Sequence, residues 1–86
     1  MAVEVLSRAA IFERVKAILV AKHGAQADQV IEDASFEADL AFDSLESVEF
    51  AMNVESEFEV AVPDDVLPTL ATVGLAVDFI EKKLGS

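Results

Sequence analysis

The spacing of apolar side chains is the feature of this sequence that most restricts its fold. In three segments apolar residues recur three or four positions apart, which is the spacing of one face of an α-helix. The only run that resembles a strand, Val60-Ala61-Val62, is too short to stand alone. The pattern predicts an all-α protein whose amphipathic helices bury one face against each other.

The first predicted helix runs from Ser7 or Arg8 to His23, and Gly24 follows as a C-terminal stop. Its apolar face consists of Ile11, Phe12, Val15, Ile18 and Leu19. A long connection follows over residues 25–42, and a connection of this length in a small domain is usually functional or carries a short helical turn. The side chains expected to anchor it to the core are Val30, Ile31, Phe36 and Leu40.

The second predicted helix runs from Asp43 to about Glu59, with Asp43 as its N-cap. Glu46, three residues later, completes the pattern of a capping box, in which its side chain would return to the N–H of the cap. A short third helix is expected over residues 64–70, weakened by Pro68.

The last predicted helix follows Thr72, which suits an N-cap, and ends before Gly85. Its apolar series is Val73, Ala76, Val77, Ile80 and Leu84. The predicted fold is therefore an all-α bundle of four helices, with a short third helix and a long loop between the first two. The 86 residues are expected to form one domain, 1–86, with residues 1–6 as a flexible N-terminal extension.

Composition excludes several kinds of protein and site. Hydrophobic residues make up 53% of the chain, which excludes intrinsic disorder, and the absence of cysteine excludes thiolate metal sites. No apolar run approaches the ~20 residues that span a bilayer. The N-terminus has neither a basic start nor a long apolar stretch, so we expect no secretory signal and a cytoplasmic protein.

The charge is strongly one-sided. The chain has six basic and 17 acidic residues, for a net charge of −11. Residues 24–81 contain no lysine or arginine. Nucleic acid and anionic membranes are therefore poor partners, and stable membrane insertion is not expected. A basic protein surface suits such a chain, although plain solubility would explain part of the charge. We expect a monomer.

The second predicted helix has two apolar faces on a helical wheel. One face, expected to enter the core, consists of Phe50, Ala51, Val54 and Phe58. The nearly opposite face, here called the apolar strip, consists of Leu45, Val48 and Met52. The carboxylates around the strip belong to Glu46, Glu49 and Glu55. An exposed apolar strip with a polar rim is typical of a protein-binding site, whereas a helix buried on both sides is the alternative.

Catalytic chemistry has little support in the sequence. His23 is the single histidine, and at the end of the first predicted helix it would complement the helix dipole. A hydrolytic couple of Ser44 with His23 has no nucleophile-elbow motif and no orienting group nearby, so no enzyme is expected. The carboxylates lack the spacing of a calcium loop, there is no glycine-rich phosphate loop, and no metal site is predicted.

Ser44 occupies the most informative position in the chain. It follows the predicted cap Asp43 and would begin the second helix. There, free backbone N–H groups and the helix dipole favour an attached phosphate. The simpler alternative is that Ser44 is only a good residue for starting a helix.

Taken in order along the chain, these segments resemble the acyl carrier protein family over nearly the whole sequence. The matching residues are Phe12-Glu13-Arg14-Val15-Lys16, Asp33-Ala34-Ser35-Phe36, Asp39-Leu40, Asp43-Ser44-Leu45-Glu46-Ser47-Val48-Glu49, Glu57-Phe58, Val62-Pro63-Asp64, Thr72-Val73 and Val77-Asp78-Phe79-Ile80. The tripeptide Asp43-Ser44-Leu45 is common by itself, but the ordered series is specific. The resemblance implies a four-helix bundle with a short third helix, in agreement with the periodicity.

The resemblance implies a non-enzymatic carrier of acyl groups as thioesters, in fatty-acid or related acyl-chain synthesis. The thiol would belong to covalent 4′-phosphopantetheine, joined by a phosphodiester to Ser44 between Asp43 and Leu45. Its partners would be a phosphopantetheinyl transferase and acyl synthases or transferases with basic patches. The implied partner surface is Leu45, Glu46, Val48, Glu49, Met52 and Glu55. The implied acyl pocket is lined by Phe36, Leu40, Phe50, Val54, Val62, Leu70 and Ala76.

Four features depart from the family pattern. Ala41 stands where a glycine is usual, and Phe42 precedes the cap where a small or aliphatic residue is commoner. Residues 1–6 are additional, and Pro68 interrupts the third helix. These features leave open a specialised carrier for a polyketide or another dedicated acyl group.

Two functions of other classes also remain open, an unmodified acidic interaction module and a small hydrolase that uses Ser44. Phe42 is a separate question, because a large aromatic side chain is costly to expose. We expect it to pack at the base of the second helix, near Leu45 or the end of the long loop. The alternative places it on the surface beside Ser44, in contact with a prosthetic arm or a partner.

Overall fold

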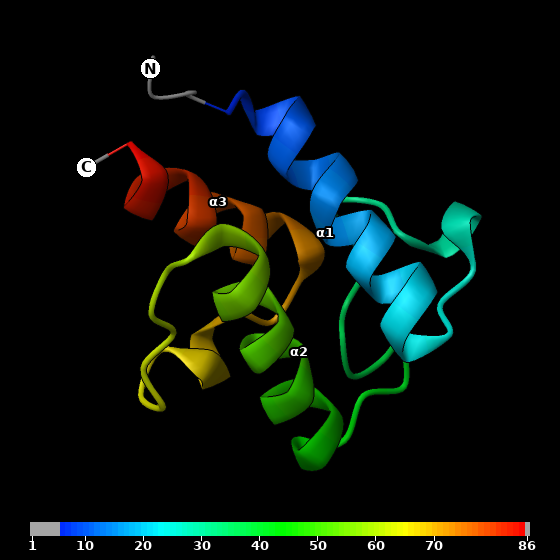
Figure 1. The fold of residues 1–86 in the computed structure, drawn as a ribbon. Helices are drawn as coiled ribbons and strands as arrows, with labels where there is room; N and C mark the ends of the chain where they lie inside the picture. Colours follow the sequence, from blue (N-terminus) through cyan, green and yellow to red (C-terminus); the bar gives the residue numbers. More distant parts are fainter. Residues whose placement is uncertain (1–5, 86) are drawn as a thin grey trace.

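Three α-helices form the framework of the computed structural model, which describes residues 6–85 (Figure 1). They are α1 (Arg8–His23), α2 (Ser44–Phe58) and α3 (Val73–Leu84). The two connections contain single 3₁₀ turns, η1 (Ala27–Gln29) and η2 (Leu67–Thr69). Residues 1–5 of the predicted N-terminal extension lie outside the described residues, whereas Leu6 packs against the core.

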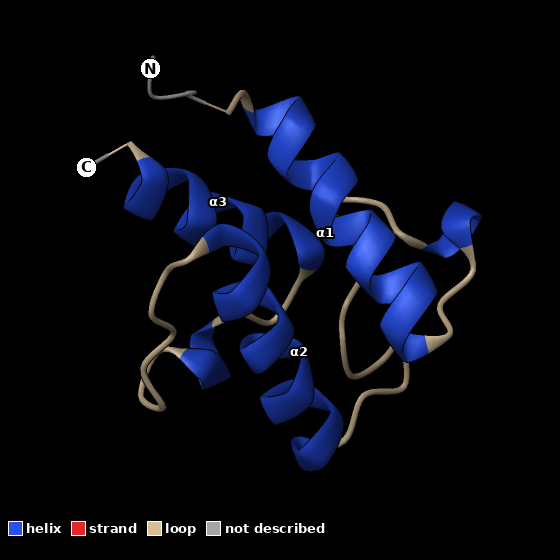
Figure 2. Cartoon of the chain, in the orientation of Figure 1, coloured by secondary structure: helices blue, strands red, loops and turns tan. Residues whose placement is uncertain are grey.

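The described residues contain no strand, only an isolated bridge between Ser35 and Thr72 (Figure 2). The all-α prediction is therefore confirmed, but the four-helix bundle is not. Where the sequence predicts a short third helix over residues 64–70, the chain forms turns and the brief η2. The reason is Pro68, the second residue of η2, which has no N–H to donate and whose ring collides with the preceding turn of an α-helix.

Each α-helix begins at a side-chain cap, whose oxygen accepts a hydrogen bond from the N–H three residues later. The caps are Ser7, Asp43 and Thr72. At the other end of α1, Gly24 has a φ of 71°, a left-handed conformation that glycine adopts without strain. The predicted starts of α2 and α3 and the predicted end of α1 are therefore confirmed.

The apolar core lies where α1 packs against both α2 and α3. Its helical side chains are Ile11, Val15, Ile18, Leu19, Phe50, Ala51, Val54, Phe58, Val73, Ala76, Val77 and Ile80. Val30 and Phe36 anchor the long loop as predicted, and Leu40 is half-buried. Ile31 is 56% exposed, so its prediction as an anchor is wrong: its neighbour Val30 takes the core position.

Backbone hydrogen bonds attach the long loop to the start of α3. Phe36 N donates to Ala71 O at 3.1 Å, and Val73 N donates to Ala34 O at 3.0 Å. These bonds satisfy polar groups that would otherwise be buried without partners. They also fix the segment that leads directly into the cap of α2.

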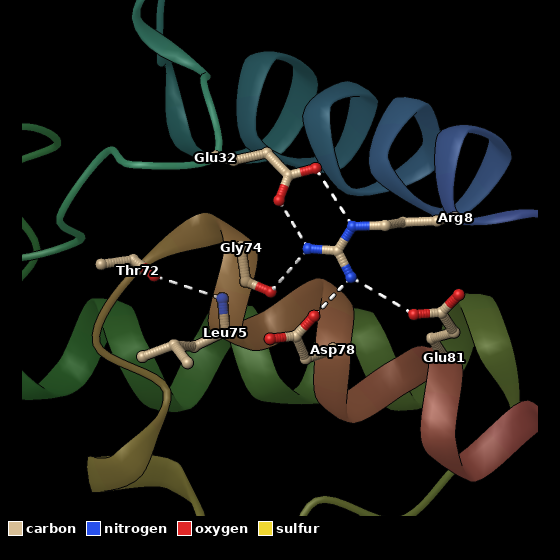
Figure 3. Close-up of polar contacts among 7 residues, drawn as sticks. All are labelled: Arg8, Glu32, Thr72, Gly74, Leu75, Asp78 and Glu81. Atoms are coloured by element: carbon tan, nitrogen blue, oxygen red, sulfur yellow. Dashed lines mark hydrogen bonds and ion pairs between the residues drawn. The ribbon is translucent and has the colours of Figure 1, made fainter.

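Arg8 joins three parts of the fold (Figure 3). Its guanidinium pairs with Glu32 of the long loop and with Asp78 and Glu81 of α3, and it also donates to Gly74 O. The hydrogen bond to Glu32, followed by that to Asp78, raises the pKa of Arg8 above its ordinary value. Arg8 thus holds the start of α1, the loop and α3 together at one end of the molecule.

Candidate functional site

Ser44 is the first residue of α2 and is exposed. The preceding residue, Asp43, caps the helix by accepting from Glu46 N at 2.8 Å. The backbone N–H groups of Asp43, Ser44 and Leu45 donate to no acceptor among the described residues. Since unpaired N–H groups and the helix dipole both favour negative charge, this turn suits a bound or attached anion.

An open groove of about 630 Å³ lies beside Ser44. It runs between the long loop, the first turn of α2 and the η2 segment. Its lining consists of Ser35, Phe36, Glu37, Phe42, Asp43, Ser44, Ser47, Leu67, Pro68, Leu70 and Ala71. A group attached at Ser44 would therefore have a surface channel of mixed polarity next to it.

Phe42 is buried beneath the start of α2. Its ring centroid lies 5.3 Å from that of Phe36, 5.3 Å from that of His23 and 6.0 Å from that of Phe50. The expectation that Phe42 packs at the end of the long loop therefore agrees with the structure, while Leu45 points elsewhere and is 67% exposed. This aromatic cluster supports the turn that presents Ser44.

His23 lies in the last turn of α1, where the sequence expects it to complement the helix dipole, and its side chain is only 1% exposed. Its Nδ1 lies 2.5 Å from Glu46 Oε2, and its Nε2 lies 3.1 Å from Asn53 Nδ2. Both ring nitrogens are thus occupied by α2. Neither is left to take a proton from Ser44, so the hydrolytic couple is not assembled.

The contacts of His23 could not be found by local sequence reasoning. They join residues 23 and 30 positions apart. One partial signal existed, since Glu46 and Asn53 are separated by seven residues and therefore share a face of α2. Nothing in the sequence indicated that α1 would place a histidine against that face.

The apolar strip is exposed on α2, with Leu45 at 67%, Val48 at 46% and Met52 at 62%. A helix buried on both sides is therefore excluded. Of the three carboxylates expected around the strip, only Glu49 is exposed and without a partner among the described residues. Glu46 is held by His23, and Glu55 accepts from Val62 N at 2.8 Å.

Five of the seven residues predicted to line an acyl pocket surround one small pocket between α2, η2 and α3. The pocket has about 10 Å³ of free space and is lined by Phe50, Ala51, Val54, Val62, Leu67, Leu70, Ala76, Phe79 and Ile80. Phe36 lines the open groove instead, and Leu40 lines neither. Leu67 and Leu70 line both, so they separate the groove from the pocket.

None of the helices over residues 6–85 is long and apolar enough to cross a membrane. Across the same residues, no three His, Cys, Asp or Glu side chains are grouped so that they could hold a metal ion.

Comparison with known proteins decides the family. Residues 13–80 match the family described as "Phosphopantetheine attachment site". A solved structure of the acyl carrier protein from Enterococcus faecalis is 31% identical and superposes with a TM-score of 0.76. The alignment covers 91% of this chain and 99% of the E. faecalis chain. This chain belongs to the acyl carrier protein family. Its role is that of an acyl carrier, and its cofactor is covalent 4′-phosphopantetheine.

The site residues of this carrier protein fit the cofactor. The arm is attached through a phosphate, and the start of α2 offers three unpaired N–H groups beside an exposed serine hydroxyl. The groove next to this hydroxyl would give an arm attached here room on the surface. The fit thus rests on donors and space that the fold provides before any group is attached.

Proposed function

We propose that this protein carries acyl groups as thioesters on a 4′-phosphopantetheine arm joined to Ser44, in fatty-acid or related acyl-chain synthesis. The observation that carries the proposal is the position of Ser44, exposed at the first turn of α2 and at the edge of the groove. The chain has no cysteine, so the arm supplies the thiol that bears the acyl group. The protein itself acts as a carrier and not as an enzyme.

In this proposal the residues around Ser44 bind and orient the phosphate of the arm. The N–H groups of Asp43, Ser44 and Leu45 interact favourably with the negative charge of the phosphate, and the helix dipole adds to this attraction. The side chain of Asp43 accepts from Glu46 N, so the aspartate stabilises the helix start that presents the hydroxyl. Phe42 supports the same turn from below.

The apolar strip and its carboxylates are the proposed docking surface. Its exposed apolar side chains are those of Leu45, Val48 and Met52. Its proposed charged rim consists of Glu46, Glu49 and Glu55, of which Glu49 is the most available. A phosphopantetheinyl transferase and acyl synthases or transferases with basic patches would be attracted by this charge, in transient encounters in the cytoplasm.

The small apolar pocket is the proposed shelter for the cargo. Of the predicted lining, Phe50, Val54, Val62, Leu70 and Ala76 surround it, and Phe36 flanks the route along the groove. About 10 Å³ holds no more than one water molecule, so an acyl chain has to move the wall formed by Leu67 and Leu70. We place Leu40 outside this shelter, because it lines neither cavity.

The test is intact-mass analysis after incubation with coenzyme A and a phosphopantetheinyl transferase. We expect the wild-type protein to gain one phosphopantetheinyl group and Ser44→Ala to gain none while keeping its helical circular dichroism. Ser47→Ala is the matched control, because Ser47 also lines the groove but should remain dispensable for attachment. Modification of Ser44→Ala would show that the attachment residue is wrong, and an unmodified wild-type protein would favour the interaction module.

A further inference from the structure

The side chain of Glu46 does not complete the capping box that the sequence predicts. In that arrangement the carboxylate would accept from the N–H of the cap, Asp43. Instead, Glu46 Oε2 lies 2.5 Å from His23 Nδ1, and the N–H of Asp43 has no acceptor among the described residues. One buried histidine therefore determines which way this carboxylate points.

The hydrogen bonds of His23 show how the ring holds its position. Asn53 Nδ2 can only donate, so Nε2 of the ring accepts and the ring proton sits on Nδ1, where it is donated to Glu46. Stacking against Phe42 and Phe50 further restricts the ring. The side chain of His23 is 1% exposed, so its ring nitrogens are shielded from water, while the side chain of Glu46 remains 36% exposed.

The direction of Glu46 affects the electrostatics at Ser44. A completed capping box would bring a negative carboxylate to the first N–H groups of α2. The same N–H groups would then be less available to a phosphate on Ser44, and the two negative charges would repel each other. With Glu46 held toward α1, the first turn keeps three N–H groups for the phosphate.

We propose that His23 is a positioning residue for loading: it holds the Glu46 carboxylate toward α1 and so keeps the start of α2 open for the phosphate carried on Ser44. The inference rests on the proposed attachment at Ser44. It assigns a function to a polar contact that would otherwise be only a link between α1 and α2.

The test is a double-mutant cycle in the full-length protein. The effect of His23→Leu on transferase-catalysed loading is measured once in the wild-type background and once in the E46Q background, where the competing charge is absent. Near a helix N-terminus such a charge changes binding by about two- to fivefold. We therefore expect His23→Leu to lower the kcat/KM of loading by that factor in the wild-type background and to have little effect in E46Q. Loss of packing by itself would act equally in both backgrounds.

Two further measurements separate positioning from stability. His23→Gln can still donate an N–H to Glu46, so it should recover most of the loading rate even if its melting temperature is lowered. In the apo protein, the Asp43 amide should exchange with solvent more slowly in His23→Leu than in the wild type, because Glu46 would then bond to it. All variants are compared at a temperature where circular dichroism shows them folded.

The outcomes distinguish this inference from the proposed function. If the wild-type protein is not loaded at Ser44, the proposed function fails, and this inference fails with it. If the wild type is loaded but His23→Leu has the same effect in both backgrounds, only the positioning role of His23 is refuted. An Asp43 amide that exchanges at the wild-type rate in His23→Leu would refute it as well.

Discussion

At the scale of single residues, Ala41 has a φ of 58°, in the left-handed region that side chains with a Cβ adopt at a cost of about 1–2 kcal/mol. The side chain is exposed, so it contributes little packing in return. This conformation explains why glycine suits the position. We predict that Ala41→Gly raises the free energy of unfolding by about 1 kcal/mol in urea denaturation, after the entropic cost of glycine.

Glu59 is the matched control for Ala41, because it ends α2 with a φ of 55°. Glu59→Gly should stabilise by a similar amount for the same reason. If Ala41→Gly destabilises while Glu59→Gly stabilises, the Ala41 Cβ must make contacts that outweigh its backbone strain.

Phe42 is the other residue whose environment makes a quantitative prediction. It is buried among His23, Phe36 and Phe50, so Phe42→Ala should cost about 3–5 kcal/mol of unfolding free energy. An exposed recognition residue would change stability by no more than about 0.5 kcal/mol. Denaturant titration distinguishes the two, with the exposed Leu45→Ala as control. A stable Phe42→Ala variant that loads more slowly would show that the ring acts in recognition.

At the scale of elements, some carboxylates of α2 stabilise the fold, whereas others are available to the proposed partners. Glu55 accepts a hydrogen bond from Val62 N and so ties the helix to the segment that follows it. Glu49 has no such partner among the described residues. Two glutamates of one helix therefore have different consequences when they are removed.

We predict that Glu55→Ala lowers the free energy of unfolding by about 1–2 kcal/mol, because it leaves the Val62 N–H without its acceptor. Glu55→Gln should recover much of this loss, since its amide oxygen can still accept. Glu49→Lys should leave stability within about 0.5 kcal/mol but slow association with a basic transferase, most strongly at low salt. Stopped-flow association rates at two salt concentrations, alongside thermal melts, measure both effects. Equal loss of stability in Glu49→Lys and Glu55→Ala would contradict this division.

At the scale of the whole molecule, the net charge of −11 opposes folding through repulsion among carboxylates. Added salt screens this repulsion, so we predict that sodium chloride raises the melting temperature. For a domain of this size, each kcal/mol of repulsion that is relieved raises the melting temperature by about 4–8 °C. Differential scanning calorimetry over a range of salt concentrations gives the slope.

The ion pairs of Arg8 stabilise the fold, and salt screens these attractions just as it screens the repulsion among carboxylates. Through them, added salt would therefore lower the melting temperature. Arg8→Met removes these attractions and should lower the melting temperature at low salt while steepening its rise with salt. A melting temperature of the wild type that falls as salt is added would show that attraction around Arg8 outweighs the repulsion elsewhere.

Local patterns in the sequence were sufficient for α1, α2 and α3 and for the caps Asp43 and Thr72, and they favoured an exposed apolar strip. These features depend on residues three or four positions apart, so the periodicity contains the required information. The position of Ser44 at a helix start followed from the same reasoning. The short third helix expected over residues 64–70 does not form, because Pro68 interrupts the segment and leaves turns and η2 in its place.

Outside the helix caps, only the tertiary structure determined which partners the polar side chains bond to. The sequence predicted that Glu46 would bond to its own helix cap, but packing of α1 on α2 places the buried nitrogen of His23 within its reach. Arg8 likewise pairs with Glu32, which is 24 positions away in the sequence, and with Asp78, which is 70 positions away. A carboxylate has several possible donors within a flexible reach, and local spacing cannot rank them. The fold decides, because it fixes which donor lies within reach, as the buried His23 does for Glu46.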